Sequence, residues 1–152
     1  MTHCDAAKLS KQHGKKSEYA LCASQWHKTL SYTDAFFKDG MTYDADFKKA
    51  FGYAPPYQAA ESSAALLVFK DAFERANDFD TKKVRNALAK TDMQTFYGNI
   101  KFAKGGQNVS KPMVLFQVIC NSDGSKCENK VVAPTKWASA KLVHPTPSWS
   151  KR

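Results

Sequence analysis

The sequence predicts an α/β fold in which helices are followed by a C-terminal β-hairpin region. Two helical segments come in series: residues 57–76, and a second segment that begins after the cap signal Asp78-Phe79-Asp80-Thr81. Two strand-like segments follow. TFYGNIKF alternates between apolar and polar residues, and MVLFQVI is the continuous apolar run of a central strand.

The predicted helix at residues 57–76 begins after a stiff double-proline loop. Pro55 and Pro56 restrict the backbone, so the loop delivers Tyr57 and Glu61 to the helix start in a constrained position. This is how a protein presents polar groups to a ligand. The nearly continuous apolar first turns predict a buried start. The later half is expected to keep a helical stripe of Phe69, Phe73 and Ala76, with the pairs Lys70–Glu74 and Asp71–Arg75 toward solvent.

The remaining elements are predicted from shorter patterns. The basic first 17 residues resemble a helix end that stops at Gly14, and EYALCA is expected to be a short buried strand. The aromatic segment SQWHKTLSYTDAFF suits a loop that lines a crevice. Two further helices are predicted by their inward-facing residues: Ala45, Phe47, Ala50 and Phe51 in residues 44–51, and Val84, Ala87 and Leu88 after Thr81.

Cys120 and Cys127 flank an Asp-Gly turn signal between two strand-like runs, so their sulfurs are expected to face each other near the mouth of a hairpin. A disulfide and two free thiols are both compatible with this spacing, because a disulfide persists only in an oxidising compartment. Asn108-Val109-Ser110 is an acceptor sequence for N-glycosylation in a glycine-rich loop.

Composition narrows the class of protein. The 152 residues suffice for one ordinary domain, and 43% hydrophobic with 24% charged residues is typical of a soluble globular one. The net charge of +9 comes from scattered lysines with only three arginines, a poor match to surfaces that read phosphates. We therefore expect no nucleic acid partner. No apolar run is long enough to span a bilayer, and the polar start is no secretory signal, so a signal peptide of an exported protein would lie outside this chain.

Three segments in order carry a resemblance to a known family. SQWHKTLSYTDAFF, FGYAPPYQAAESSAA and TFYGNIKFAKGGQNVSKPM resemble the C-terminal part of the type I periplasmic-binding-protein family, with Phe51 where the family usually has tyrosine. Its members are the extracellular ligand-binding proteins of branched-chain amino acid ABC transporters and their receptor relatives. The resemblance covers residues 15–149 and leaves residues 1–14 as a basic tail.

The resemblance implies a two-lobed protein, each lobe a parallel sheet with helices on both faces, that closes over an amino acid-like ligand in the interlobe cleft. Family chains are much longer, so residues 1–152 are expected to be a single partial ligand-binding domain: a fragment or a truncated gene product. EYALCA would belong to one lobe, the Tyr57 helix to the other, and MVLFQVI would return near the last crossover. The expected partners are a small amino acid-like ligand and a transporter permease or receptor module.

The same resemblance places three residues toward the ligand. Tyr57 occupies a position where the family often has an aromatic residue, and Trp26 follows a strand end that faces the cleft. Glu61 could bind an ammonium group, or it could instead satisfy the helix N-terminus. For Tyr57 and Trp26 the alternative is core packing. The segment from Cys120 to Cys127 and the Asn108 acceptor sequence depart from the family pattern and suggest an oxidising, extracellular setting, because receptors in front of a membrane also use this fold. From the resemblance as a whole we expect a periplasmic or extracellular location.

Other chemistry is not expected. His3, Cys4, His13, Cys22 and His27 lack the paired spacing of a zinc site, and Gly105-Gly106 is not followed by the helix and Lys-Ser/Thr pair of a phosphate loop. We therefore expect no catalytic residue, metal or cofactor. Three alternatives remain: the sensing domain of a membrane receptor, a basic module that binds anions or nucleic acid, and a truncated product that self-associates without binding a ligand.

Overall fold

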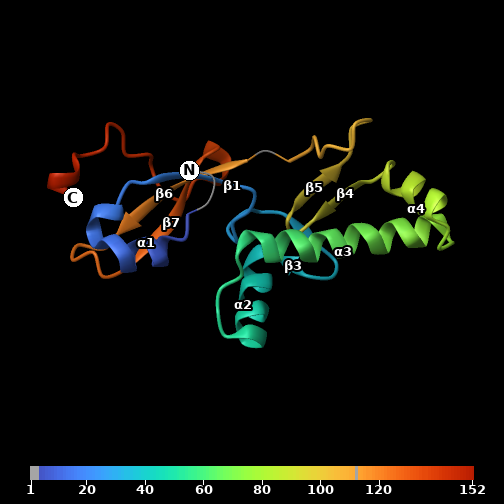
Figure 1. Cartoon of the computed structure of the whole chain (residues 1–152), viewed down its shortest axis with the longest axis horizontal. Helices are drawn as coiled ribbons and strands as arrows, with labels where there is room; N and C mark the ends of the chain where they lie inside the picture. Colours follow the sequence, from blue (N-terminus) through green and yellow to red (C-terminus); the bar gives the residue numbers. More distant parts are fainter. Residues whose placement is uncertain (1–3, 112) are drawn as a thin grey trace. The chain divides into compact units, whose positions relative to one another are not determined.

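The computed structural model describes residues 4–111 and 113–152, and it has the predicted α/β composition with a C-terminal β-hairpin. Contacts along the chain divide it into two compact units (Figure 1). Unit 1 comprises residues 1–25 and 113–152, and unit 2 comprises residues 26–112. EYALCA and MVLFQVI therefore belong to one unit and the Tyr57 helix to the other.

Unit 1 is built on a three-stranded antiparallel sheet in the order β1-β6-β7. Its strands are β1 (Leu21–Ser24), β6 (Val114–Cys120) and β7 (Cys127–Ala133). The expectation that EYALCA as a whole is extended is wrong. Glu18 ends the short 3-10 helix η1 (Gly14–Ser17), and Tyr19 has a φ of 65°. That left-handed backbone is incompatible with a strand, so β1 starts only at Leu21.

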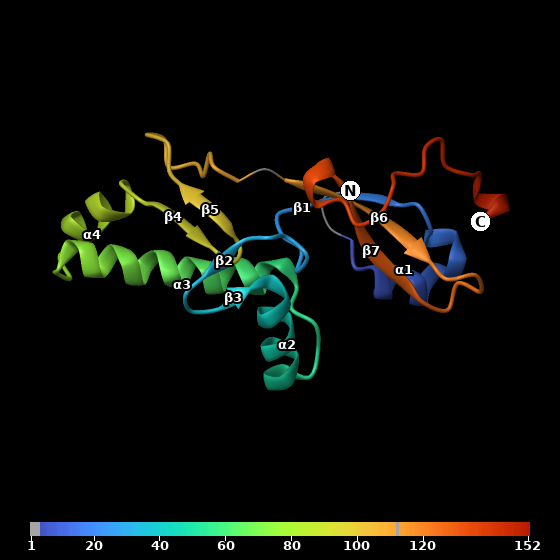
Figure 2. The same ribbon diagram turned by 180° about the vertical axis from the view of Figure 1, so that it is seen from behind.

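Helix α1 (Ala6–His13) lies beside the β6–β7 hairpin in both views (Figures 1 and 2). The Asp5 side chain caps its start by accepting a hydrogen bond from the Lys8 N–H, and Gly14 ends it, as predicted. Ala6 packs against the buried Val118 and Cys127 side chains. A disulfide between Cys4 and Cys22 also ties the start of this helix to β1. Part of the predicted basic tail is therefore an integral element of unit 1.

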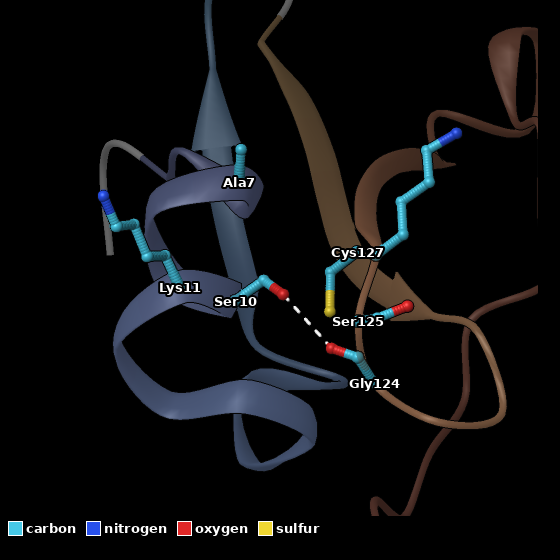
Figure 3. Close-up of a pocket in the computed structure, with 7 residues that line it drawn as sticks. Ala7, Ser10, Lys11, Gly124, Ser125 and Cys127 are labelled. Atoms are coloured by element: carbon cyan, nitrogen blue, oxygen red, sulfur yellow. Dashed lines mark hydrogen bonds between the residues drawn. The ribbon is translucent and has the colours of Figure 1, made fainter.

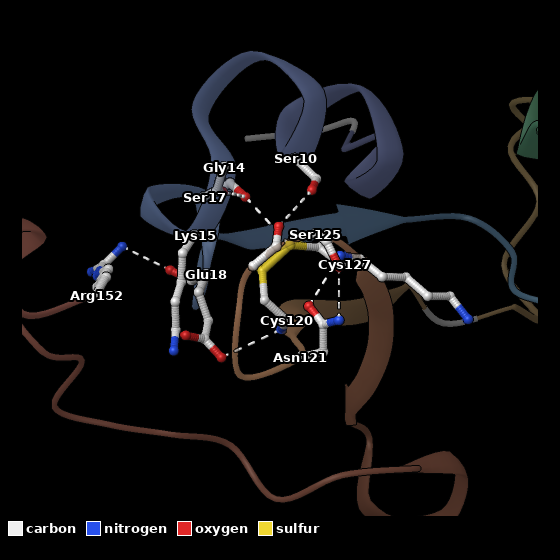
Figure 4. Close-up of a disulfide and its surroundings, with 12 residues drawn as sticks. Ser10, Gly14, Lys15, Ser17, Glu18, Cys120, Asn121, Ser125, Cys127 and Arg152 are labelled. Atoms are coloured by element: carbon white, nitrogen blue, oxygen red, sulfur yellow. Dashed lines mark hydrogen bonds between the residues drawn. A yellow bond between two sulfur atoms is a disulfide. The ribbon is translucent and has the colours of Figure 1, made fainter.

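The irregular C-terminal segment is held to the sheet by polar side chains. Gln117 is fully buried on β6, and its amide accepts from the Val143 N–H at 2.8 Å and donates to the Val143 carbonyl at 3.1 Å. The Arg152 guanidinium donates to the Glu18 carbonyl at 2.8 Å (Figure 4). Two short 3-10 turns, η2 (Thr135–Trp137) and η3 (Trp149–Lys151), are its regular parts.

Over its described residues, 26–111, unit 2 contains three helices and two small antiparallel strand pairs. The helices are α2 (Gly40–Phe51), α3 (Tyr57–Ala76) and α4 (Thr81–Leu88); the pairs are β2 (Thr33–Asp34) with β3 (Lys38–Asp39), and β4 (Asp92–Thr95) with β5 (Gly98–Lys101). TFYGNIKF is therefore not one strand. It turns at Phe96 and Tyr97, where the Thr95 hydroxyl donates to the Gly98 carbonyl at 2.9 Å.

Helix α3 has the predicted bounds, but its buried stripe differs from the predicted one. The buried residues are small and four positions apart: Ala60, Ala64, Val68 and Ala72. Phe69 and Phe73, expected on the inward stripe, are 47% and 38% exposed. Small side chains let the helix approach its neighbours closely, which turns the larger ones outward. The ion pairs Lys70–Glu74 and Asp71–Arg75 form as predicted, each at 2.6 Å.

Helix α2 begins at Gly40, four residues earlier than expected, and faces inward with different residues. The Asp39 side chain caps it, and Gly40 packs so closely on Lys28 that an added Cβ would lie 2.6 Å from the Lys28 carbonyl oxygen. Tyr43 and Asp44 are buried, whereas Ala45, Ala50 and Phe51 are exposed and Phe47 is half-buried. The expected inward face of Ala45, Phe47, Ala50 and Phe51 is therefore wrong, because the Tyr43 ring enters the aromatic core instead.

A cluster of aromatic rings forms the core of unit 2 around Phe96, which has no exposed surface. The Phe96 ring centroid lies 4.3 Å from Tyr43, 5.0 Å from Phe37 and 6.1 Å from Trp26. Asp34 fixes the backbone beside it, since its carboxylate accepts from the Phe96 N–H at 2.6 Å. This core holds the β4–β5 turn in place. On α4, Val84 and Ala87 are buried as predicted, with Leu88 half-buried.

Candidate functional site

The start of α3 brings the first two polar groups of the site together. Pro56 occupies the N-cap position with an extended backbone (φ −68°, ψ 159°) and provides no side-chain cap. Tyr57 is half-buried at the first helical position, and Glu61 is exposed one turn later. Because Glu61 lies one turn inside the helix, it is too far along the chain to be the capping residue. Its carboxylate faces solvent.

The turn between β4 and β5 supplies the third group, Tyr97. The neighbouring Phe96 is anchored in the aromatic core, and the Asp34 carboxylate holds the Phe96 N–H. Tyr97 is only 4% exposed, and its hydroxyl oxygen has no hydrogen-bond partner among the described residues. A buried phenol in this state is unusual, because leaving such a group unsatisfied costs about 1–3 kcal/mol.

Lys111 supplies the fourth group and lies across Tyr97. Its Nζ atom is 3.2 Å from the centroid of the Tyr97 ring. The aliphatic part of the side chain passes over Gly98, where an added Cβ would lie 2.5 Å from Lys111 Cδ. Gly98 also has a φ of 145°, which a residue with a side chain rarely adopts. The absence of a side chain at Gly98 therefore leaves the space that the Lys111 side chain occupies.

The electrostatics connect these four groups. Burial lowers the pKa of Lys111 to about 7, and the negative charge of Glu61 opposes that shift. Burial also raises the pKa of Tyr97 well above 10, with further contributions from Glu61 and then Tyr57. Tyr97 is thus held as a neutral hydrogen-bond donor, and Lys111 loses its proton within the physiological range. We refer to Tyr57, Glu61, Tyr97 and Lys111 as the α3 cluster.

The sequence predicted part of this cluster. Tyr57 and Glu61, which the sequence places toward a ligand, both belong to the α3 cluster, and their contact with a ligand stays a prediction. Trp26 is 5% exposed and packs edge-on against Tyr43 and Phe96, so in this structure it supports the turn that carries Tyr97. Sequence reasoning missed Tyr97 and Lys111. The one available signal was the Tyr97-Gly98 pair inside a strand-like run, because a glycine there indicates a close approach of another group.

The other candidate residues lie in structural roles. Cys120 and Cys127 face each other across β6 and β7 and form a disulfide (Figure 4). Asn108 is exposed, and its amide accepts from the Lys101 N–H and donates to the Asn99 carbonyl, both at 3.1 Å. Glycosylation of Asn108 stays a prediction.

Unit 1 has a separate hollow of about 340 Å³ between α1 and the β6–β7 loop (Figure 3). Ser10 donates to the Gly124 carbonyl across it at 3.3 Å. Lys126, one of the lysines that line it, pairs with Glu128 at 2.9 Å. The Glu128 carboxylate therefore compensates the charge of Lys126, and none of the predicted ligand residues lines the hollow.

Neither a metal site nor a membrane span is found in the described part of the chain. Cys4 and Cys22, two of the N-terminal candidates, are bonded to each other, and His3 lies outside the described residues. Among residues 4–111 and 113–152, no group of three or more His, Cys, Asp or Glu side chains could hold a metal ion. No described helix combines the length and the apolar character that a transmembrane segment needs.

These features define a class of protein: an α/β fold with a polar cluster at a helix start beside an aromatic core. The chain belongs to the periplasmic binding protein family, whose sequence pattern it matches over residues 1–125. The resemblance seen in the sequence is thereby confirmed.

Solved structures show the same fold. The chain is similar to a leucine-binding protein of Thermotoga maritima, with 22% identity, a TM-score of 0.63, and coverage of 86% of this chain and 35% of that one. A periplasmic binding protein of Burkholderia mallei has 16% identity and a TM-score of 0.67, with coverage of 90% and 38%. A branched-chain amino acid transporter substrate-binding protein of Streptococcus pneumoniae, solved in complex with isoleucine, has 15% identity and a TM-score of 0.59. That match covers 84% of this chain and 34% of the other. The chain thus spans little more than a third of the length of these proteins.

Proposed function

We propose that this chain is part of a solute-binding protein that recognises an amino acid or similar small polar ligand and delivers it to the membrane permease of an ABC transporter. The observation that carries the proposal is the α3 cluster, in a chain that belongs to the periplasmic binding protein family. The function is capture without chemical change, so the protein is not an enzyme. Residues 1–152 act as one partial ligand-binding domain.

Each predicted residue has a defined part in this proposal. The exposed Glu61 carboxylate accepts hydrogen bonds from the ammonium group of the ligand, as charge-assisted pairs of this kind are strong. The half-buried Tyr57 ring contacts the ligand from the first turn of α3. Trp26 either reaches the ligand or acts only through Phe96, on which it packs.

The two disulfides support a periplasmic or extracellular location. Cys4–Cys22 and Cys120–Cys127 account for all four cysteines of the chain. Disulfides of this kind persist in the bacterial periplasm and outside cells, whereas the cytosol keeps thiols reduced. A solute-binding protein works in those same compartments.

A thermal-shift assay of the full chain with the twenty L-amino acids tests the proposal. A ligand that binds only the folded chain stabilises it by about 2.7 kcal/mol at a concentration 100 times its Kd, so at least one amino acid should raise the melting temperature by several degrees. Glu61→Gln keeps the size of the side chain but removes its charge, and should weaken binding about tenfold or more.

The matched control is Glu74→Gln on the same helix. Glu74 is exposed and pairs with Lys70, away from the first turn, so this variant should bind as the wild type does. If none of the twenty amino acids changes the melting temperature, the proposed function is wrong. Equal affinities of Glu61→Gln and the wild type would remove Glu61 from the site.

A further inference from the structure

The least explained group of the molecule is the hydroxyl of Tyr97. It is buried and lacks a hydrogen-bond partner among the described residues, although the ring is firmly placed by its anchored neighbour Phe96. Its raised pKa keeps the phenol protonated, so the hydroxyl offers a donor. Buried donors are normally paired in folded proteins. A buried hydroxyl without an acceptor within the described residues therefore indicates that a bound molecule supplies the acceptor.

Lys111 adds a second donor over the face of the Tyr97 ring. Its Nζ atom lies 3.2 Å from the Tyr97 ring centroid, and an ammonium group offers only donors. Taking this amine out of water disfavours its charge, which is why its pKa falls to about 7. The Glu61 charge acts on both Lys111 and Tyr97, Tyr57 acts on Tyr97, and the Tyr97 ring lies against the Lys111 amine. A bound anion beside Nζ would restore the proton.

The amine lies over the face of the same ring that carries the hydroxyl. Two donors on one ring, one of them cationic when protonated, select an anionic acceptor. We propose that Tyr97 and Lys111 together bind a carboxylate group of the ligand, while Glu61 of the same cluster receives its ammonium group. The inference rests on the proposed function and narrows it: the ligand is a zwitterion or an amino acid with an acidic side chain, and its carboxylate is bound by unit 2. A ligand without a carboxylate would leave the Tyr97 donor unsatisfied, at a cost in affinity.

Calorimetry on the full chain with two matched pairs of ligands tests this. L-leucine and L-leucinamide differ in the α-carboxylate, and L-glutamate and L-glutamine differ in the side-chain carboxylate. For the pair whose carboxylate binds here, the acid should bind about ten to a hundred times more tightly than the amide. Lys111→Met and Tyr97→Phe should remove most of that preference by weakening the acid, and leave the amide within about twofold.

Lys104→Met is the control, since Lys104 is an exposed lysine of the same unit. Tyr97→Phe removes only a hydroxyl that has no hydrogen-bond partner among the described residues, so without ligand the variant should melt at the wild-type temperature or above it. If the hydroxyl served only the stability of the fold, its removal would not leave the melting temperature intact and still weaken ligand binding. At pH 8, wild-type binding should also take up a fraction of a proton, seen as a dependence of the heat on the buffer, and Lys111→Met should abolish this uptake.

The outcomes separate this inference from the proposed function. Amino acid binding that both variants leave unchanged, or that favours the amides, would overturn the carboxylate role of Tyr97 and Lys111 and leave the proposed function standing. Absence of binding by every amino acid would overturn both. Equal losses for acid and amide would show that the variants damage the site as a whole, and would also count against the inference.

Discussion

Replacing Phe96 by alanine is expected to destabilise the chain by about 3–5 kcal/mol, the usual cost of removing a buried phenylalanine. Phe96 has no exposed surface, and its ring meets Tyr43, Phe37 and Trp26 at centroid distances of 4.3 to 6.1 Å. The cavity would open where elements from distant parts of the sequence meet. Denaturant unfolding followed by circular dichroism measures the loss.

Phe79→Ala is the matched control, because it deletes the same atoms from a ring that is 86% exposed. It should cost less than about 0.5 kcal/mol, as surface substitutions usually do. Comparable losses for the two variants would mean that the aromatic cluster is not the core of unit 2. In a partly folded Phe96→Ala chain, Tyr97 should also lose its defined position, because the two residues form one turn.

The sequence predicted well those elements that local signals determine. The double proline fixed the start of α3 at Tyr57, the Asp80 side chain caps α4, and the Asp123-Gly124 turn joins β6 to β7. In each case the residues that decide the structure are neighbours along the chain. Such signals are visible without knowledge of the fold.

Errors arose where distant parts of the chain decide which face is buried. By periodicity alone, Phe69 and Phe73 form an inward stripe on α3, but the alanines four residues apart allow closer packing and take that place. On α2, the Tyr43 ring joins Phe96, more than fifty residues away, and this reverses the expected face. Hydrophobic periodicity indicates that a helix has a buried side, and tertiary packing selects which one.

The site was only half predictable for the same reason. Tyr57 and Glu61 share one helix turn, so their proximity follows from helix geometry. Tyr97 and Lys111 come within electrostatic range of them through Asp34, which holds the β4–β5 turn, and through Gly98, which leaves room for the lysine side chain. These contacts join separate segments of the chain, and no local sequence motif at Tyr97 or Lys111 predicts them.

The second large effect concerns pH, because the folded chain holds the Lys111 proton less tightly than the unfolded chain does. Lysine has an ordinary pKa of 10.5, and burial lowers that of Lys111 to about 7. Between these values the unfolded chain keeps the proton and the folded chain has lost it. The free energy of unfolding should therefore rise with pH across this window, by up to about 1.4 kcal/mol per pH unit from this group, and below pH 7 the full penalty applies.

Comparison with Lys111→Met isolates this contribution from all other titrations. The free energy of unfolding of the wild type minus that of the variant should increase by about 2 kcal/mol between pH 7 and pH 9, as measured by urea unfolding at each pH. The range stops there because the lysine of the unfolded chain begins to lose its own proton as the pH approaches 10.5. Lys104→Met should follow the wild type at every pH. Parallel pH profiles for wild type and Lys111→Met would mean that Lys111 remains hydrated in the folded chain, and a hydrated amine would have no need of the ligand carboxylate to keep its charge.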